Sequence, residues 1–98
     1  MNISYKNKKL EKICTNAEEA RKKHGNIMAD LIHQRIDEIS AAPTVEMMIQ
    51  FHIGGCHRLS GKRKRQYAVD LEHPYRMVFE KREDSIQIAH IIEIIDYH

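Results

Sequence analysis

Proton-transfer chemistry in this chain rests first on its seven histidines, since imidazole titrates at about pH 6.5. One of them, His57, opens residues 57–67, which contain no acidic residue. The cations of this basic loop are Arg58, Lys62, Arg63, Lys64 and Arg65, a local formal charge of +5. Cations concentrated in one segment predict contact with a polyanion. The alternative is that this run of basic residues is only a solvent-exposed loop whose charges keep the protein soluble.

Two further groups could handle a charged substrate. His98 lies two residues after Asp96 and carries the α-carboxylate, and both anions favour its imidazolium, which suits an acid. Arg76 offers a planar fork of donors that matches a phosphate. An ion pair of Arg76 with Asp70 or Glu80 on the sheet surface is the alternative.

A metal site is not expected. His52, Cys56 and His57 are close in sequence, but no matching second pair of ligands exists, so zinc is disfavoured and no cofactor is predicted. His90 alternates with Ile88 and Ile92, which is typical of a hydrogen-bonded core histidine rather than a ligand.

Helices are expected in the first half of the chain. The pattern predicts a short amphipathic helix over residues 5–14 and a long helix over 17–41, which Gly25-Asn26 kinks or splits. Thr15 and Glu18 match a capping box at the start of the long helix. A short helix over 45–51 follows, with Thr44 as its cap.

The second half alternates with a period of two, which predicts strands. We expect a strand over residues 67–71 with one solvent-facing side and a second strand over residues 75–79. A polar hairpin loop over residues 81–85 should follow. The last strand, over residues 86–95, is apolar on both faces and is therefore expected to be central in the sheet. The fold class is therefore α+β: helices over about 5–51 pack on one face of an antiparallel sheet over about 56–97.

Length and composition narrow the class of protein. Ninety-eight residues make a single domain, 1–98, and 42% hydrophobic with 31% charged residues is typical of a globular chain. No apolar run approaches the ~20 residues that span a bilayer, and no secretory signal is recognisable. Cys14 and Cys56 are too few for a disulfide framework, so we expect reduced thiols and a cytoplasmic protein that does not contact membranes.

Several segments, in order, resemble the HigB branch of the RelE/ParE toxin superfamily. They are CHRLSGKRKRQYAVDLEHPYRMVFE at 56–80, EIIDYH at 93–98, and ARKKHGNIMA at 20–29 continuing into QRI at 34–36. The resemblance covers nearly the whole chain. It implies a RelE-like fold and a toxin of a bacterial toxin–antitoxin pair. HigB-like members are endoribonucleases that cut messenger RNA, generally in the ribosomal A site.

The resemblance also implies partners. They would be a helix-turn-helix antitoxin, messenger RNA and the ribosome, with operator DNA reached only through the antitoxin. The chain departs from the family pattern at two places. Ser60 stands where the family often has a lysine, and the next loop, where the family often has a glycine and an acid, is more basic here through Lys62 and Arg65. Either of these cations is a candidate replacement for the missing lysine. The antitoxin would cover either the apolar long helix or an exposed sheet edge.

RNA cleavage without a metal needs a base, an acid and a cation, because the 2′-hydroxyl is the nucleophile. The resemblance makes His57, Arg76, Asp96, Tyr97 and His98 the catalytic set. Either histidine can be the base, and Tyr97 would stack on a base or pack at a sheet edge. The basic loop would bind phosphates.

Two other functions remain open on the same fold. One is a non-enzymatic inhibitor like those of the ParE branch, which poisons DNA gyrase. The other is a module that binds RNA without cutting it.

Overall fold

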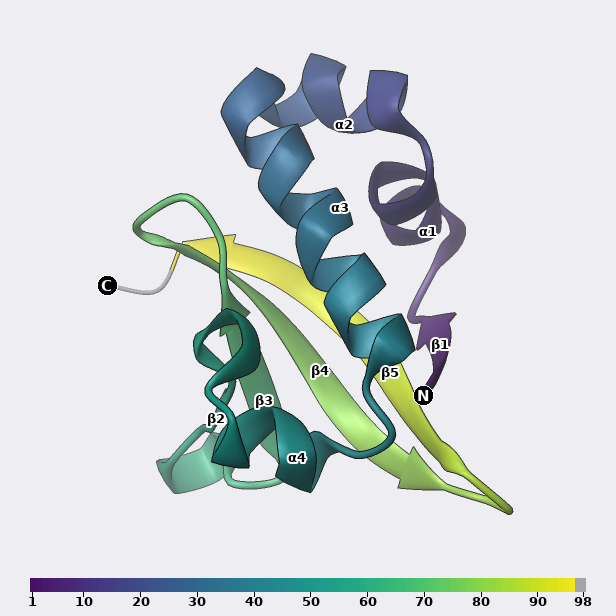
Figure 1. Ribbon diagram of the computed structural model, residues 1–98. Coiled ribbons are helices and arrows are strands. Elements are labelled where there is room, and N and C mark those ends of the chain that lie inside the picture. Colours follow the sequence, from purple (N-terminus) through teal and green to yellow (C-terminus); the bar gives the residue numbers. More distant parts are fainter. Residues whose placement is uncertain (97–98) are drawn as a thin grey trace.

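A five-stranded sheet forms the framework of the protein in the computed structural model, which describes residues 1–96 (Figure 1). The spatial order is β1-β5-β4-β3-β2. β1 runs parallel to β5, and the other neighbours are antiparallel. The strands are β1 Asn2–Tyr5, β2 His57–Arg58, β3 Gln66–Asp70, β4 Tyr75–Glu83 and β5 Gln87–Asp96.

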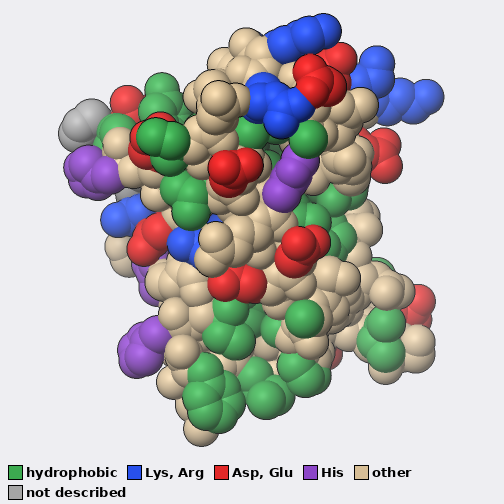
Figure 2. Space-filling model, turned by 45° about the horizontal axis from the view of Figure 1, so that its top comes forward, with side chains coloured by type: hydrophobic (Ala, Val, Ile, Leu, Met, Phe, Trp, Pro, Cys, Tyr) green, Lys and Arg blue, Asp and Glu red, His purple; other side chains and the backbone are tan. Residues whose placement is uncertain are grey.

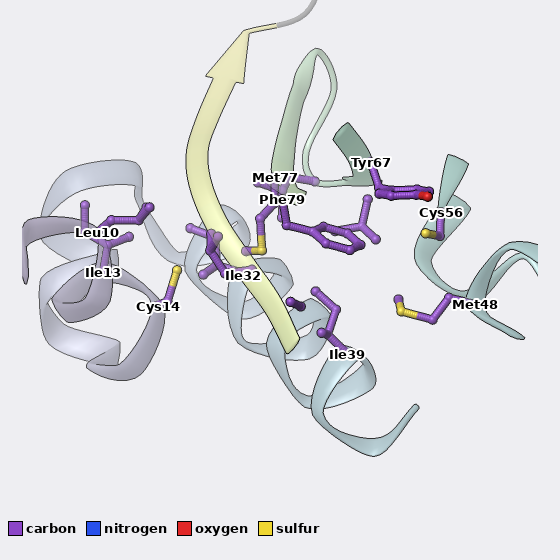
Figure 3. Close-up of a cluster of buried hydrophobic side chains, with 14 of the residues drawn as sticks. Leu10, Ile13, Cys14, Ile32, Ile39, Met48, Cys56, Tyr67, Met77 and Phe79 are labelled. Carbon is purple, nitrogen blue, oxygen red and sulfur yellow. The ribbon is translucent and has the colours of Figure 1, made fainter. Parts of the chain in front are cut away.

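The α-helices cover one face of this sheet, which confirms the predicted α+β class (Figure 1). They are α1 Lys8–Thr15, α2 Ala17–His24, α3 Asn26–Ala41 and α4 Val45–Gln50, with short 3₁₀ turns η1 Ile53–Gly55 and η2 Gly61–Arg63. The core lies between helices and sheet, where Ile32 and Ile39 of α3 meet Met77 and Phe79 of β4 (Figure 3). The opposite face carries no α-helix among the described residues and is called the bare face.

β1 corrects the expectation of an all-antiparallel sheet. Ile3 and Tyr5 alternate with polar Asn2 and Ser4, a period of two that the prediction of a helix from residue 5 overlooked. The helix begins only after Asn7, whose side chain accepts a hydrogen bond from the Leu10 amide at 2.8 Å. The sheet is therefore mixed, and β5 is central between β1 and β4, as predicted.

The long predicted helix is two helices. Gly25, at φ 85°, separates α2 from α3. The cap of α2 is Asn16, which accepts from the Glu18 and Glu19 amides, so the predicted Thr15 cap is wrong. The Thr15 hydroxyl instead donates to a carbonyl of the preceding helix. The predicted Thr44 cap of α4 is confirmed by its bond to the Met47 amide at 3.1 Å.

The strand β3 is buried on both faces, which corrects its predicted wet face. Tyr67 and Val69 enter the main core, whereas Ala68 lies on the bare face and is fully buried with Leu59 and Val78. Leu59 belongs to the segment between β2 and β3, and this segment folds over the sheet. The alternating pattern of β3 alone could not predict that another segment buries its second face.

Two exposed hydrophobic side chains lie in and just after α4: Met47 is 38% exposed and Phe51 is 61% exposed. Hydrophobic side chains also gather at the lower edge of the molecule in Figure 2. Within residues 1–96 no helix has the length and apolar character to span a membrane.

Candidate functional site

His57 and Arg76 meet on the bare face, although nineteen positions separate them. Arg76 Nη1 lies 3.5 Å from His57 Nε2. His57 comes from β2 and Arg76 from β4, and the intervening strand β3 places the small Ala68 opposite His57. Both side chains are half-buried. The sheet thus brings together an imidazole and a guanidinium that sequence analysis had singled out separately.

The hydrogen bonds of His57 define which ring nitrogen carries the proton. Nδ1 lies 2.9 Å from the Gly55 carbonyl oxygen. A carbonyl only accepts, so Nδ1 carries the hydrogen. In the neutral ring Nε2 then keeps its lone pair and faces Arg76, whose guanidinium only donates. In this tautomer the Nε2 lone pair therefore faces a donor, the Arg76 guanidinium.

Asp70 sets the position of Arg76 from the neighbouring strand. The two residues are directly paired between β3 and β4, and Asp70 Oδ1 lies 3.5 Å from Arg76 Nε. The ion pair considered as the alternative role for Arg76 is therefore present. It leaves Nη1 directed toward His57, so the ion pair and a phosphate contact are compatible.

Two consecutive glycines let the chain approach this ion pair. Gly54 and Gly55 have φ of 59° and 68°, values that L side chains rarely adopt. A Cβ on Gly54 would lie 2.7 Å from Cδ of Arg35, and one on Gly55 would lie 2.2 Å from Oδ2 of Asp70. Sequence analysis did not identify this role, although two adjacent glycines just before a candidate histidine were a usable signal.

A hollow of about 160 Å³ lies beside Arg76. Its walls come from the ends of β3 and β4 and the turn between them, with Asp70, His73 and Tyr75 among the lining residues. Arg76 is itself one of the residues that line this hollow.

The basic loop contains cations of two kinds. Arg63 is half-buried and forms an ion pair with Glu93 of β5, and Arg58 Nε donates to the Lys64 carbonyl at 2.5 Å. Lys62, Lys64 and Arg65 are exposed, and none of the three forms an ion pair within residues 1–96. The predicted set of five thus separates into two residues that hold the loop and three that face solvent.

Asp96 lies on the face of the sheet opposite to that of Arg76 and His57. Asp96 is opposite Tyr75 in the β4–β5 register, whereas Ile95 is opposite Arg76. Because side chains alternate along a strand, Asp96 lies on the helix-bearing face and Arg76 on the bare face. Tyr97 and His98 lie outside the described residues, so their catalytic roles stay predictions.

His90 lies on the bare face rather than in the main core. Its Nδ1 shares a 2.7 Å hydrogen bond with the Ser4 hydroxyl, so the ring is hydrogen-bonded as predicted. Burial lowers its pKa, nearby Arg82 lowers it further, and Glu80 opposes them.

Both cysteines are buried and free. Burial raises the pKa of Cys14 to about 12 and that of Cys56 to about 11, so both thiols stay protonated near neutral pH. No three histidine, cysteine or carboxylate side chains among residues 1–96 lie close enough together to hold a metal ion.

Comparison with known proteins identifies the fold. Neither a family model nor a curated protein sequence matches the chain. A solved structure described as a YoeB/ParE toxin from Agrobacterium tumefaciens is similar, with a TM-score of 0.60 over 100% of both chains at 12% identity. The likeness establishes a RelE/ParE-like fold for this chain.

Proposed function

We propose that this protein is the toxin of a bacterial toxin–antitoxin pair and a metal-independent endoribonuclease that cuts messenger RNA. The single observation that carries the proposal is the contact between His57 and Arg76 on the bare face. The RelE/ParE-like fold and the sequence resemblance to the HigB branch support the same function.

The proposed chemistry begins at the 2′-hydroxyl of the RNA. His57 Nε2 takes its proton, the oxygen attacks the adjacent phosphorus, and the Arg76 guanidinium stabilises the charge on the pentavalent phosphorane. A cyclic 2′,3′-phosphate forms as the bond to the 5′-oxygen breaks, and an acid protonates that oxygen. His98, with Asp96 and Tyr97 near it in sequence, is the proposed source of this proton.

The remaining elements of the proposal concern partners. The exposed cations Lys62, Lys64 and Arg65 would hold RNA phosphates, from the message or from the ribosomal A site. A helix-turn-helix antitoxin would neutralise the toxin in the cytoplasm, and operator DNA would be contacted only through that antitoxin.

The test is messenger RNA cleavage by purified protein in a translating extract that contains a chelator of divalent ions at a level that spares translation. We expect cut transcripts with the parent, and a loss of about 10²-fold or more with His57→Ala, the size of a general-base contribution. His52→Asn is the matched control, because His52 is exposed and asparagine tolerates its positive φ of 55°.

Two outcomes would replace the proposal. Intact messages together with inhibited DNA supercoiling would favour the gyrase inhibitor. RNA binding that persists without any cut product would favour the non-cleaving module.

A further inference from the structure

The strand β5 continues past the short strand that pairs with its outer side. β1 ends at Tyr5, opposite Ile91, whereas β5 runs on to Asp96 (Figure 1). From residue 92 onward, no strand lies on this side of β5 within residues 1–96. We call residues 92–96 the open edge. An open edge presents backbone N–H and C=O groups that an added strand can pair with.

The hydrogen bonds of the sheet show which residue of the open edge points outward. The Tyr75 carbonyl accepts from the Leu71 amide on the β3 side, so the peptide groups of the next residue, Arg76, point to β5. Arg76 is opposite Ile95, whose peptide groups therefore point back to β4. Because these directions alternate along a strand, the N–H and C=O groups of Ile94 point to the open side.

A hollow of about 220 Å³ lies beside the open edge. Its apolar lining comes from Leu10 and Ile13 of α1 and from Ile92 and Ile94 of β5. Leu10 and Ile13 also belong to the main core, so packing holds this lining in place. Asn7 lines the hollow too, but its side-chain oxygen already accepts from the Leu10 amide. The lining therefore suits aliphatic side chains of a strand that pairs with the open edge.

The charges around the hollow favour an acidic partner. Lys9 and Lys23 line it, are exposed, and form no ion pair within residues 1–96. Glu93, the carboxylate in the lining, is already paired with Arg63. Burial and the charge of Lys23 lower the pKa of His24, which also lines the hollow, so this ring is neutral at pH 7.

The wider field has the same sign. Residues 6–24, which include α1 and α2, carry seven lysines or arginines against three glutamates. Carboxylates of a partner would therefore be attracted to this end of the sheet.

We infer that the open edge and its hollow bind an extended acidic peptide segment of a partner protein by strand addition. The segment places aliphatic side chains in the hollow and carboxylates near Lys9 and Lys23. A peptide fits better than RNA, because RNA has no backbone amides to pair with a strand. The inference goes beyond the proposed nuclease activity, since two strands separate β5 from β2, which carries His57.

The first test measures anisotropy of two fluorescent peptides, EEVTVEE and its basic counterpart KKVTVKK. At about 0.15 M salt the parent should bind the acidic peptide about tenfold more tightly. The double variant Lys9→Glu with Lys23→Glu should weaken the acidic peptide by about tenfold. Lys8→Glu with Lys22→Glu is the matched control, because these exposed lysines lie on the same helices but do not line the hollow. It should stay within about threefold of the parent, since salt screens charges beyond about 8 Å.

The second test measures hydrogen exchange of single amides by NMR. Saturating EEVTVEE should slow exchange at the Ile94 amide by about tenfold or more, because that N–H would enter a new ladder. The Ile95 amide is the internal control: it points to β4 and should not change.

Several outcomes would overturn the inference. Equal weakening by the two lysine pairs would reduce the binding to general charge attraction. Binding without slower exchange at Ile94 would exclude strand addition, and so would equal binding, or no binding, of the two peptides. Slower exchange at Ile94 on addition of an RNA oligonucleotide would assign the edge to nucleic acid, and slower exchange at higher protein concentration would assign it to a second copy of the chain. RNA cleavage by the parent and by His57→Ala is measured separately, so each proposal can fail without the other.

Discussion

Gly55 and Asp70 lie so close that a Cβ on residue 55 would stand 2.2 Å from Oδ2 of the aspartate. The same carboxylate holds Arg76, and the Gly55 carbonyl holds His57. One glycine therefore sets the positions of both side chains of the candidate site.

Gly55→Ala should lower the free energy of unfolding by about 2–3 kcal/mol. About 1 kcal/mol comes from the positive φ, and the rest comes from displacing Asp70. The measurement is urea unfolding. Gly61→Ala is the control, because Gly61 has φ +65° but no atom within 4 Å of its Cβ position, so only the smaller loss is expected. Equal losses would mean that the Asp70 contact has no energetic weight.

Arg76→Lys should reduce RNA cleavage by about 10²-fold, since a lysine cannot hold Asp70 and a phosphate with one planar group. The rate in the translating extract is the readout, with unfolding by urea to verify the fold. Arg21→Lys, on exposed α2, should cleave like the parent. If Arg76→Lys cleaves RNA like the parent, Arg76 has only a structural role, as an ion-pair partner on the sheet surface.

The basic loop should separate into its two kinds of cation when RNA binding is titrated with salt. Replacing Lys62, Lys64 and Arg65 with glutamine should reduce the slope of log affinity against log salt by about 2, at about 0.7 per phosphate contact. Arg63→Gln should change the slope by less than about 0.7, since Glu93 already pairs with it. Equal effects per cation would contradict this division.

His90 predicts a specific dependence of stability on pH. Its pKa is lowered in the fold, first by burial and then by Arg82, so the unfolded chain binds this proton at higher pH. Its contribution is present above about pH 6.5 and is lost as pH falls below that value. His90→Asn should therefore lose less stability than the parent between pH 7 and 5.

Urea unfolding at the two pH values measures this difference. His24→Asn should act in the same direction, because burial and Lys23 lower the pKa of His24. A His90→Asn variant that loses as much stability as the parent would contradict the assignment.

Asn16→Ala should cost about 1 kcal/mol of unfolding free energy, because Asn16 caps α2. Thr15→Ala should cost less, since the Thr15 hydroxyl donates to a helix carbonyl and caps nothing. Thermal or urea unfolding of the two variants decides between the caps. A larger stability loss for Thr15→Ala than for Asn16→Ala would support the predicted capping box instead.

The sequence was informative where local pattern decides structure. Period-two alternation located β3, β5 and the first part of β4, and the α+β class followed from their order. The predicted hairpin loop over 81–85 is wrong at its start, because β4 continues to Glu83 and pairs there with β5. β1 was missed because its alternating pattern covers only four residues, and the lysines that follow suggested an amphipathic helix from residue 5. The capping box failed because Thr15 and Asn16 are both good caps, and Thr15 is already the last residue of α1.

The candidate site was predictable in its residue types but not in its supports. His57 and Arg76 were identified from their chemistry, whereas their contact depends on strand register across β3. Arg63 looked like its neighbours because its partner, Glu93, is thirty positions away. Asp96 was grouped with Arg76, although alternation along β5 places the two on opposite faces.

The segment between β2 and β3 is fixed at three points: Leu59 in an apolar cluster, Arg58 on the Lys64 carbonyl, and Arg63 on Glu93. Such a segment has little conformational entropy left to lose when it meets a partner. Its three solvent-facing charges are thus preorganised. Binding to them does not carry the entropic cost of ordering a flexible loop, so the affinity is higher.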